Sequence, residues 1–212
     1  NIIGRGATGR KYTVEDIDEP FVRDHRMLHL ERADEPSHRL ADIMHEAGGL
    51  VAFDGDSYSD ATQAMLPKID VFIGSEFYYN KLFGSSENYR ENLLTLQRLG
   101  VKIVVFTLGE KGSVALWKGG YRFCPGYQVE VVDTLGAGDV YHGGYLFALL
   151  EGMDPGECAQ FANAVAAIKC MGIGGRANTP NYEMTRQFME TGDFDRSLVQ
   201  QKTEFYSNFS VK

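Results

Sequence analysis

The residues best suited to chemistry lie in one short stretch, residues 133–139, which reads Asp-Thr-Leu-Gly-Ala-Gly-Asp. Residues 128–132 before it are β-branched and alternate in polarity, which predicts a strand. The apolar residues of the segment 140–148 recur near helical spacing. Glycines between a strand and a helix let the backbone approach a ligand closely. Because the first amides of a helix have no intrahelical partner, such a helix end attracts anions, above all phosphate.

Asp139 falls in the first turn of this predicted helix, where the helix dipole stabilises a negative charge. A carboxylate base beside an anion-binding turn is the combination that transfers a phosphoryl group to a hydroxyl. The simpler alternative is a strand–turn–helix in which the aspartate only caps the helix. His142 lies one turn further along and could face the same site, although a surface or core histidine is the commoner arrangement.

Residues 133–139 resemble the C-terminal signature of the PfkB/ribokinase family of carbohydrate kinases, and the resemblance extends over nearly the whole chain. It implies that Asp139 takes a proton from a sugar hydroxyl. It also implies that the amides of Gly136, Ala137 and Gly138 form an anion hole for the transferred phosphoryl group. Asp133 is implied to bind the acceptor sugar, and the implied cofactors are ATP and Mg²⁺.

A second glycine-rich turn, residues 107–112, follows a predicted strand. Two glycines three residues apart can present backbone amides to a phosphate. Thr107, Gly109 and Gly112 have the spacing of the Thr-x-Gly-x-x-Gly nucleotide loop of PfkB kinases, so the resemblance implies that they contact the nucleotide. The alternative is a plain hairpin, because residues 113–117 continue as a strand.

For two later segments, only the resemblance implies a role in nucleotide binding. Asn163 lies on a predicted helix, residues 157–171, where PfkB kinases often place a polar contact to adenine; a capping or solvent-facing asparagine is the alternative. Residues 171–178 are rich in glycine and resemble the loop that closes the nucleotide side and holds a monovalent cation in some members. Asp154 and Pro155 predict the start of the helix, as an N-cap followed by proline at the first helical position.

The chain departs from the family where Mg²⁺ and phosphate are usually held. Many PfkB kinases carry Asn-x-x-Glu here, and the corresponding residues are Ser75 and Tyr78. A serine can still bind a hydrated metal or a phosphate, whereas a tyrosine cannot replace a carboxylate. Glu76 is a nearby acidic residue, so Ser75 and Glu76 are the candidate metal ligands.

Strands and helices alternate through the middle of the chain, which predicts an α/β fold with a mainly parallel sheet flanked by helices on both faces. The predicted strands are residues 27–30, 50–53, 70–73 and 102–108, and the predicted helices are residues 38–47, capped by Ser37, 60–66 and 87–99. A meander of residues 113–117, 121–124 and 128–132 adds an antiparallel edge. Because ligands bind at the carboxyl ends of parallel strands, we expect Asp54, Ser75, Thr107 and Asp139 along one edge.

Length and composition indicate a single α/β domain, residues 1–212, and the resemblance makes this domain ribokinase-like. The net charge of −8 opposes binding to nucleic acid or anionic membranes, which need clustered Lys and Arg. The longest apolar runs are too short to span a bilayer. Three widely spaced cysteines do not suggest a disulfide framework and indicate a reducing compartment, so we expect a cytoplasmic protein.

The start of the chain lacks features that the resemblance would predict. PfkB kinases have a longer N-terminal half with a lid over the sugar, so we expect this chain to be the C-terminal nucleotide-binding portion, with the N-terminal part of the fold absent. A Gly-x-Gly-x-x-Gly at Gly4, Gly6 and Gly9 leads into polar residues without helical spacing. It is therefore expected to be a turn and not a dinucleotide-binding motif.

These observations predict ATP-dependent phosphorylation of a sugar hydroxyl, with a sugar or sugar-like alcohol and ATP as partners. The resemblance also makes a homodimer a candidate assembly. One alternative is a ribokinase-like kinase of a nucleoside or vitamin alcohol. Another is a non-catalytic kinase-like protein that binds a sugar or a protein partner. Tyr78 in place of a glutamate favours the binding protein, whereas intact Asp139 with its glycines favours the enzyme.

Overall fold

The computed structural model describes residues 10–197, 200–201 and 204–205. The glycine-rich turn predicted within residues 1–9 lies outside the described residues. Within the part of the chain that the structure describes, no helix has the length and apolar character needed to cross a membrane.

Six strands form one sheet, in the order in which they occur along the chain. The parallel strands are β1 (Met27–Leu30), β2 (Leu50–Gly55), β3 (Val71–Gly74) and β4 (Ile103–Thr107). The antiparallel strands are β5 (Gly112–Trp117) and β6 (Gly120–Pro125). The predicted parallel sheet with an antiparallel edge is therefore confirmed.

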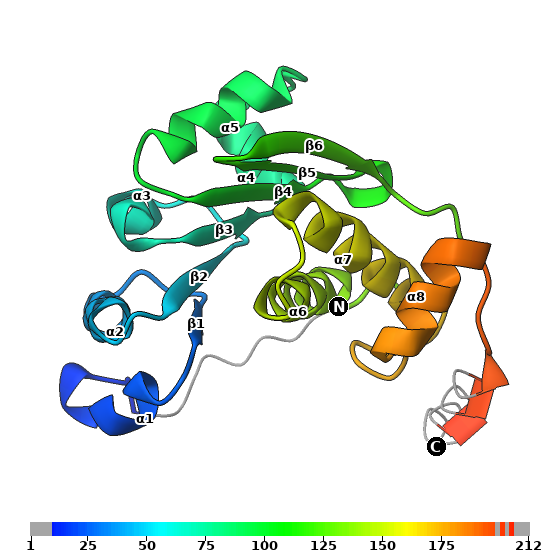
Figure 1. Cartoon of the computed structure of the whole chain (residues 1–212), viewed down its shortest axis with the longest axis horizontal. Helices are drawn as coiled ribbons and strands as arrows, with labels where there is room; N and C mark the ends of the chain where they lie inside the picture. Colours follow the sequence, from blue (N-terminus) through cyan, green and yellow to red (C-terminus); the bar gives the residue numbers. More distant parts are fainter. Residues whose placement is uncertain (1–9, 198–199, 202–203, 206–212) are drawn as a thin grey trace.

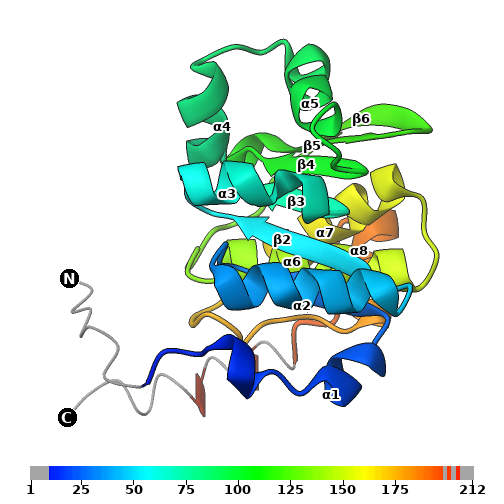
Figure 2. The same ribbon diagram turned by 90° about the vertical axis from the view of Figure 1, so that its left-hand side faces the viewer.

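Helices cover both faces of this sheet, as predicted (Figure 1). One face carries α2 (Glu35–Glu46), α3 (Asp60–Met65), α4 (Glu76–Phe83) and α5 (Tyr89–Gln97). The other face carries α6 (Ala137–Leu150) and α7 (Pro155–Cys170), and α8 (Tyr182–Thr191) packs on α7. Right-handed crossovers that step in one direction across a sheet all lie on the same face, so the other face is left for the helices that follow the last strand. Figure 2 shows this division, with α2 in front of β2 and α6 behind it.

Short elements complete the described fold. They are α1 (Glu19–Arg23) and three 3-10 turns, Val14–Asp16, Leu66–Lys68 and Gly109–Lys111. The predicted start of α7 is confirmed. The Asp154 side chain accepts a hydrogen bond from the amide of Gly156, and Pro155 is the first helical residue.

The two faces of the sheet carry side chains of different size. On the α2–α5 face, Phe72 packs between Phe106 and Tyr78, with ring centroids 5.7 Å and 5.1 Å away. The opposite face presents small buried residues, Ala52, Val71, Ile73, Val105 and Ala115. These small residues let α6 and α7 lie close to the sheet, which brings the N-terminus of α6 near the carboxyl ends of the parallel strands.

Three local predictions need correction. Residues 128–132 pair with no strand; the chain leaves the sheet after β6, and the amide of Val132 donates to the carbonyl of Cys170. The α2 helix begins earlier than expected, because Asp34 and not Ser37 caps it. Residues 76–83 form a helix, α4, that the sequence analysis did not identify, and Ser75 caps it.

Asp70 joins three parallel strands at the start of β3. Its carboxylate accepts hydrogen bonds from the amide of Val51, from Nε2 of His45 at 2.9 Å and from Nζ of Lys102 at 2.7 Å. Its side chain is only 4% exposed. Burial alone would raise the pKa of Asp70, but the hydrogen bonds from Lys102, Val51 and His45 outweigh burial and hold the pKa below its ordinary value.

We expect Asp70→Asn to lower the free energy of unfolding by about 1–3 kcal/mol at pH 7, because an amide cannot accept all three hydrogen bonds. The folded pKa of Asp70 is depressed, so its contribution is complete above about pH 4 and is lost as the pH falls through the folded pKa. Urea unfolding at pH 7 and at pH 3.5 should therefore show a gap from the wild type that narrows in acid. Asp42→Asn, which removes a surface ion pair with Lys68, is the control and should cost less than about 1 kcal/mol. Equal unfolding midpoints for wild type and Asp70→Asn at pH 7 would contradict this role.

Candidate phosphoryl-transfer site

The N-terminus of α6 stands between two cavities. Ala137 and Gly138 line the first cavity, of about 340 Å³. Asp139, the next residue, lines the second cavity, of about 450 Å³. Both volumes lie in the range of small-molecule sites. Consecutive residues of one helical turn therefore face two separate ligand-sized spaces.

The turn that starts α6 is fixed by contacts with the loop after α7. Gly136 has φ +76°, and a Cβ at this position would lie 2.5 Å from the carbonyl oxygen of Gly175, so only glycine fits. The carboxylate of Asp133 accepts hydrogen bonds from the amides of Leu135 and Gly174, each at 2.8 Å. These two hydrogen bonds lower the pKa of Asp133. Asp133 lines neither cavity, so its predicted contact with a sugar stays a prediction.

The backbone amides at this helix end differ in their availability. The amide of Ala137 donates to the carbonyl of Thr134 at 3.0 Å, whereas the amides of Gly138 and Asp139 donate to no backbone carbonyl among the described residues. A Cβ built on Gly138 would meet nothing within 4 Å. Of the predicted anion hole, Gly138 thus presents an open amide to the first cavity, and Ala137 is held within the turn.

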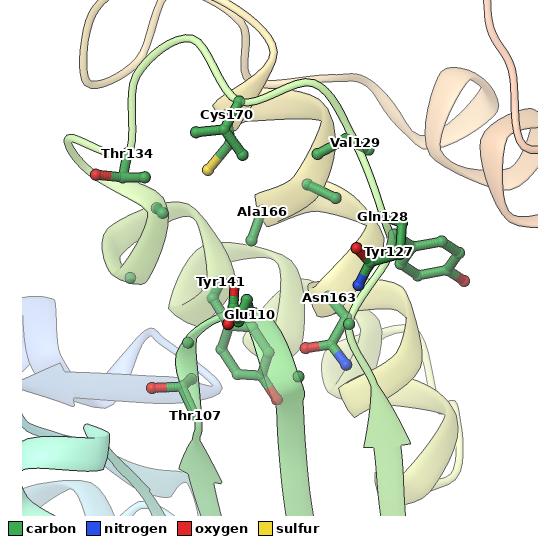
Figure 3. A pocket seen from close by; sticks show the side chains of 17 residues that line it. Thr107, Glu110, Tyr127, Gln128, Val129, Thr134, Tyr141, Asn163, Ala166 and Cys170 are labelled. Carbon is green, nitrogen blue, oxygen red and sulfur yellow. The ribbon is translucent and has the colours of Figure 1, made fainter.

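The first cavity brings together all the residues predicted to contact a nucleotide. Figure 3 shows Thr107 at the end of β4, Asn163 on α7 and Thr134 before α6 around it. Gly109 and Gly112 also line it. One part of the wall is apolar or aromatic, formed by Tyr127, Val129, Val131, Ala166, Ala167 and Cys170. A flat, weakly polar ring would pack against this wall, with an anionic group at the glycine turns.

The predicted nucleotide residues also have structural tasks. The β4–β5 connection is a hairpin, as the alternative held, and a Cβ on Gly112 would lie 2.1 Å from the carbonyl oxygen of Cys124. The Asn163 side chain is buried, and its Nδ2 donates to the carbonyls of Cys124 at 3.0 Å and Pro125 at 3.4 Å. Asn163 therefore closes the end of β6 while its side chain borders the cavity.

The second cavity is acidic. Its lining includes Asp54, Asp56 and Glu31 together with Asp139, and Arg32 is its basic residue. Burial, followed by the negative charges of Asp56 and Asp139, raises the pKa of Asp54 to about 6. The negative charge of Glu31 acts on Asp54 as well, and four carboxylates grouped in this way favour the binding of a cation or of polar hydroxyl groups.

Two histidines lie beside this acidic group. Burial, and then the proximity of His29, lowers the pKa of His142 to about 3, so its ring stays neutral at neutral pH. His142 is therefore a buried residue at the site, and the surface alternative for it is wrong. Desolvation also lowers the pKa of His29.

The candidate metal ligands lie close to the nucleotide turn. A side chain added at Gly109 would meet Oε2 of Glu76 at 3.6 Å, so this carboxylate lies beside the nucleotide turn without lining the first cavity, and it offers the oxygen ligand that Mg²⁺ prefers. The Ser75 hydroxyl accepts from the amide of Tyr78 and donates to the carbonyl of Asp56. Tyr78 itself is a core residue whose hydroxyl accepts from Gln63. Glu76 thus fits a metal better than Ser75, and both assignments stay predictions.

The loop predicted to hold a monovalent cation contains an unusual buried amide. Asn178 is 2% exposed, and neither its Oδ1 nor its Nδ2 has a hydrogen-bond partner among the described residues. An amide oxygen of this kind fits a monovalent cation. The ammonium of Lys169, fully buried and 2.7 Å from the carbonyl oxygen of Asp133, lies at the turn before α6 that this loop contacts through Gly174. The cation remains a prediction.

Several residues that border the two cavities were not predicted from the sequence. They are Tyr127, Gln128, Val129, Val131, Thr134, Tyr141, Ala166, Ala167 and Cys170 in the first cavity, and Glu31, Arg32 and Asp56 in the second. The one sequence feature that points to Tyr127, Val129 and Val131 is their alternation along the chain, which is also typical of a strand. Asp56 follows a predicted strand beside Asp54, so it could have been included with the carboxyl-edge residues.

Comparisons with known proteins identify similar sequences and similar structures. Residues 8–181 match the pfkB family carbohydrate kinase. A ribokinase of Arabidopsis thaliana is 30% identical over 171 residues, which cover 76% of this chain and 45% of that protein. A nucleoside kinase of Methanothermobacter thermautotrophicus is 26% identical over 79% of this chain and 55% of its own length. The crystal structure of Arabidopsis thaliana ribokinase complexed with ribose and ATP superimposes with a TM-score of 0.74, at 26% identity, over 82% of this chain and 58% of that one.

These similarities cover only part of each relative's own length. The chain spans between 45% and 58% of the relatives named above. The family match itself covers most of the chain and contains both glycine turns and Asp139. The chain therefore belongs to the PfkB family of carbohydrate kinases.

Proposed function

We propose that the protein transfers the γ-phosphoryl group of ATP to a hydroxyl of a sugar or sugar-like alcohol. The observation that carries this proposal is the position of the α6 N-terminus between two cavities. Gly138 faces the cavity with the apolar wall and the glycine turn, and Asp139 faces the acidic one. A phosphoryl group passing between the two spaces would cross the end of this helix.

The two cavities and the N-terminus of α6 each have a role in the proposed reaction. The first cavity holds the nucleotide, with the adenine against the wall around Tyr127 and the phosphates at the 107–112 turn. The open amides of Gly138 and Asp139 stabilise the charge that develops on the phosphoryl oxygens. The carboxylate of Asp139 accepts the proton of the acceptor hydroxyl in the second cavity. Mg²⁺, when bound with the nucleotide, neutralises phosphate charge, and Glu76 is the residue best placed to hold it.

The acceptor class is supported by the relatives and by the acidic cavity. The similar Arabidopsis structure is described as complexed with ribose and ATP, and carboxylates such as Asp54 and Asp56 accept hydrogen bonds from sugar hydroxyls. A nucleoside acceptor is the second candidate, because a nucleoside kinase is among the relatives. A nucleoside also carries a ribose, so turnover of ribose against adenosine or cytidine distinguishes the two.

Asp139→Asn should lower kcat by at least roughly 10²-fold, because the amide cannot accept the hydroxyl proton. ADP release with ATP, Mg²⁺ and a panel of sugars and nucleosides measures turnover, and calorimetry measures nucleotide affinity. Affinity and unfolding temperature should change little, since Asp139 is exposed and lines the other cavity. A variant that keeps more than about a tenth of the wild-type kcat would exclude Asp139 as the base.

Gly138→Val should weaken ATP binding at least about tenfold without unfolding the protein, because a Cβ here meets nothing within 4 Å and the branched side chain would fill the space before the open amides. Gly143→Val is the matched control. Gly143 lies on the same helix, is exposed, and also has nothing within 4 Å of an added Cβ. Titration calorimetry with ATP should separate the two variants, and equal ATP affinities would remove the anion-binding role of the helix end.

A further inference from the structure

Three side chains with metal-binding chemistry meet beside the acidic cavity, although they come from distant parts of the sequence. His29 lies on β1, Asp54 on β2 and His142 on α6. One nitrogen or oxygen atom of each residue lies within 4.8 Å of the corresponding atoms of the other two. None of the three has been assigned above as the base, the anion hole or a nucleotide contact.

The register of β1 with β2 and the position of α6 bring these three residues together. His29 is the register partner of Ala52 in the parallel pairing of β1 with β2. Because side chains alternate along a strand, Asp54 projects from the same face of the sheet as Ala52 and His29. That face is the one covered by α6, so His142 approaches from above, and its ring centroid lies 5.3 Å from that of His29.

His142 is buried without a satisfactory hydrogen-bond partner. The residue is 6% exposed, and its Nδ1 makes no hydrogen bond to any described residue. Its Nε2 lies 3.5 Å from Oδ1 of Asp54, which is longer than an ordinary hydrogen bond. The buried ring is therefore poorly satisfied, and an ion held between Nε2 and Oδ1 of Asp54 would give Nε2 the partner that the protein alone does not provide.

The spacing of the three side chains fits a metal ion. In a tetrahedral zinc site with bonds of about 2.0–2.2 Å, neighbouring ligand atoms lie roughly 3.3–3.6 Å apart. Nε2 of His142 and Oδ1 of Asp54 are already at 3.5 Å. His29 lies on the edge strand β1 and is partly desolvated beside His142, so a small change of its side-chain rotamer would close the remaining distance.

We propose that His29, Asp54 and His142 bind one divalent transition-metal ion, with Zn²⁺ as the best fit. Two imidazoles and one carboxylate suit Zn²⁺, Fe²⁺ and Mn²⁺, whereas Mg²⁺ prefers oxygen ligands only. The site is therefore separate from the Mg²⁺ that accompanies ATP. Three protein ligands leave a coordination position for water or for an oxygen of the acceptor, since Asp54 also lines the cavity that contains Asp139.

The test uses untagged protein, stripped with a chelator, in the presence of millimolar Mg²⁺. Equilibrium dialysis with Zn²⁺ and elemental analysis should give one bound Zn²⁺ per chain. Co²⁺ in place of Zn²⁺ should give the visible absorption of a low-coordinate site with nitrogen ligands. His29→Ala and Asp54→Asn should each weaken Zn²⁺ binding at least about tenfold. Both side chains reach solvent, so these variants should fold, which circular dichroism would verify.

His25→Ala is the matched control, because His25 is exposed and its Nδ1 contacts only the carbonyl of Phe21 nearby. It should bind Zn²⁺ as the wild type does. The proposal is overturned if the wild type binds no Zn²⁺, if Mg²⁺ displaces it, or if His29→Ala and Asp54→Asn leave the affinity unchanged. None of these measurements depends on kinase turnover, so the outcome is independent of the proposed activity.

Discussion

The site depends on one close approach, between Gly136 at the start of α6 and the backbone of Gly175 in the loop after α7. With φ +76° and only 2.5 Å between an added Cβ and the carbonyl oxygen of Gly175, any other residue would separate the two segments. Asp133 joins the same segments by accepting from Gly174, and Lys169 of α7 donates to the Asp133 carbonyl. These contacts fix where the helix begins, and that position determines what the open amides and Asp139 can reach.

The sheet helps to position α6 because its two faces carry side chains of different size. Large aromatic side chains such as Phe72 and Phe106 fill the α2–α5 face, whereas small residues such as Ala52 face α6. Between α6 and α7 the approach is equally close, since a Cβ on Gly144 would lie 3.1 Å from Cγ2 of Val165. Tight packing of small residues holds α6 rigidly over the carboxyl ends of the strands, which is where ligands bind in such sheets. The core thus sets the position of α6 over the sheet, and the loop after α7 fixes where the helix begins.

The sequence predicted the features that have a local cause. Asp154 and Pro155 specify a helix start through their own chemistry, and the 107–112 turn is recognisable from its glycines. Residues 128–132 have the alternation of a strand for a different reason: Val129 and Val131 line a cavity. Strand pairing requires a neighbour at the right distance, and α7 lies there instead. His29, Asp54 and His142 could not be grouped from the sequence, since their meeting depends on strand register and on where α6 crosses the sheet.

Tyr78 adds no negative charge to the site because it lies in the aromatic core. The second cavity is nonetheless acidic, since Glu31, Asp54, Asp56 and Asp139 line it, and burial followed by the neighbouring negative charges raises the pKa of Asp54 to about 6. An acidic cavity of this kind repels the phosphates of a nucleotide unless cations are bound nearby. Arg32 is the basic residue in its lining, and the net charge of the chain is −8. A cation bound near Asp139 would lower this repulsion, and the carboxylates and imidazoles grouped there offer oxygen and nitrogen ligands for one.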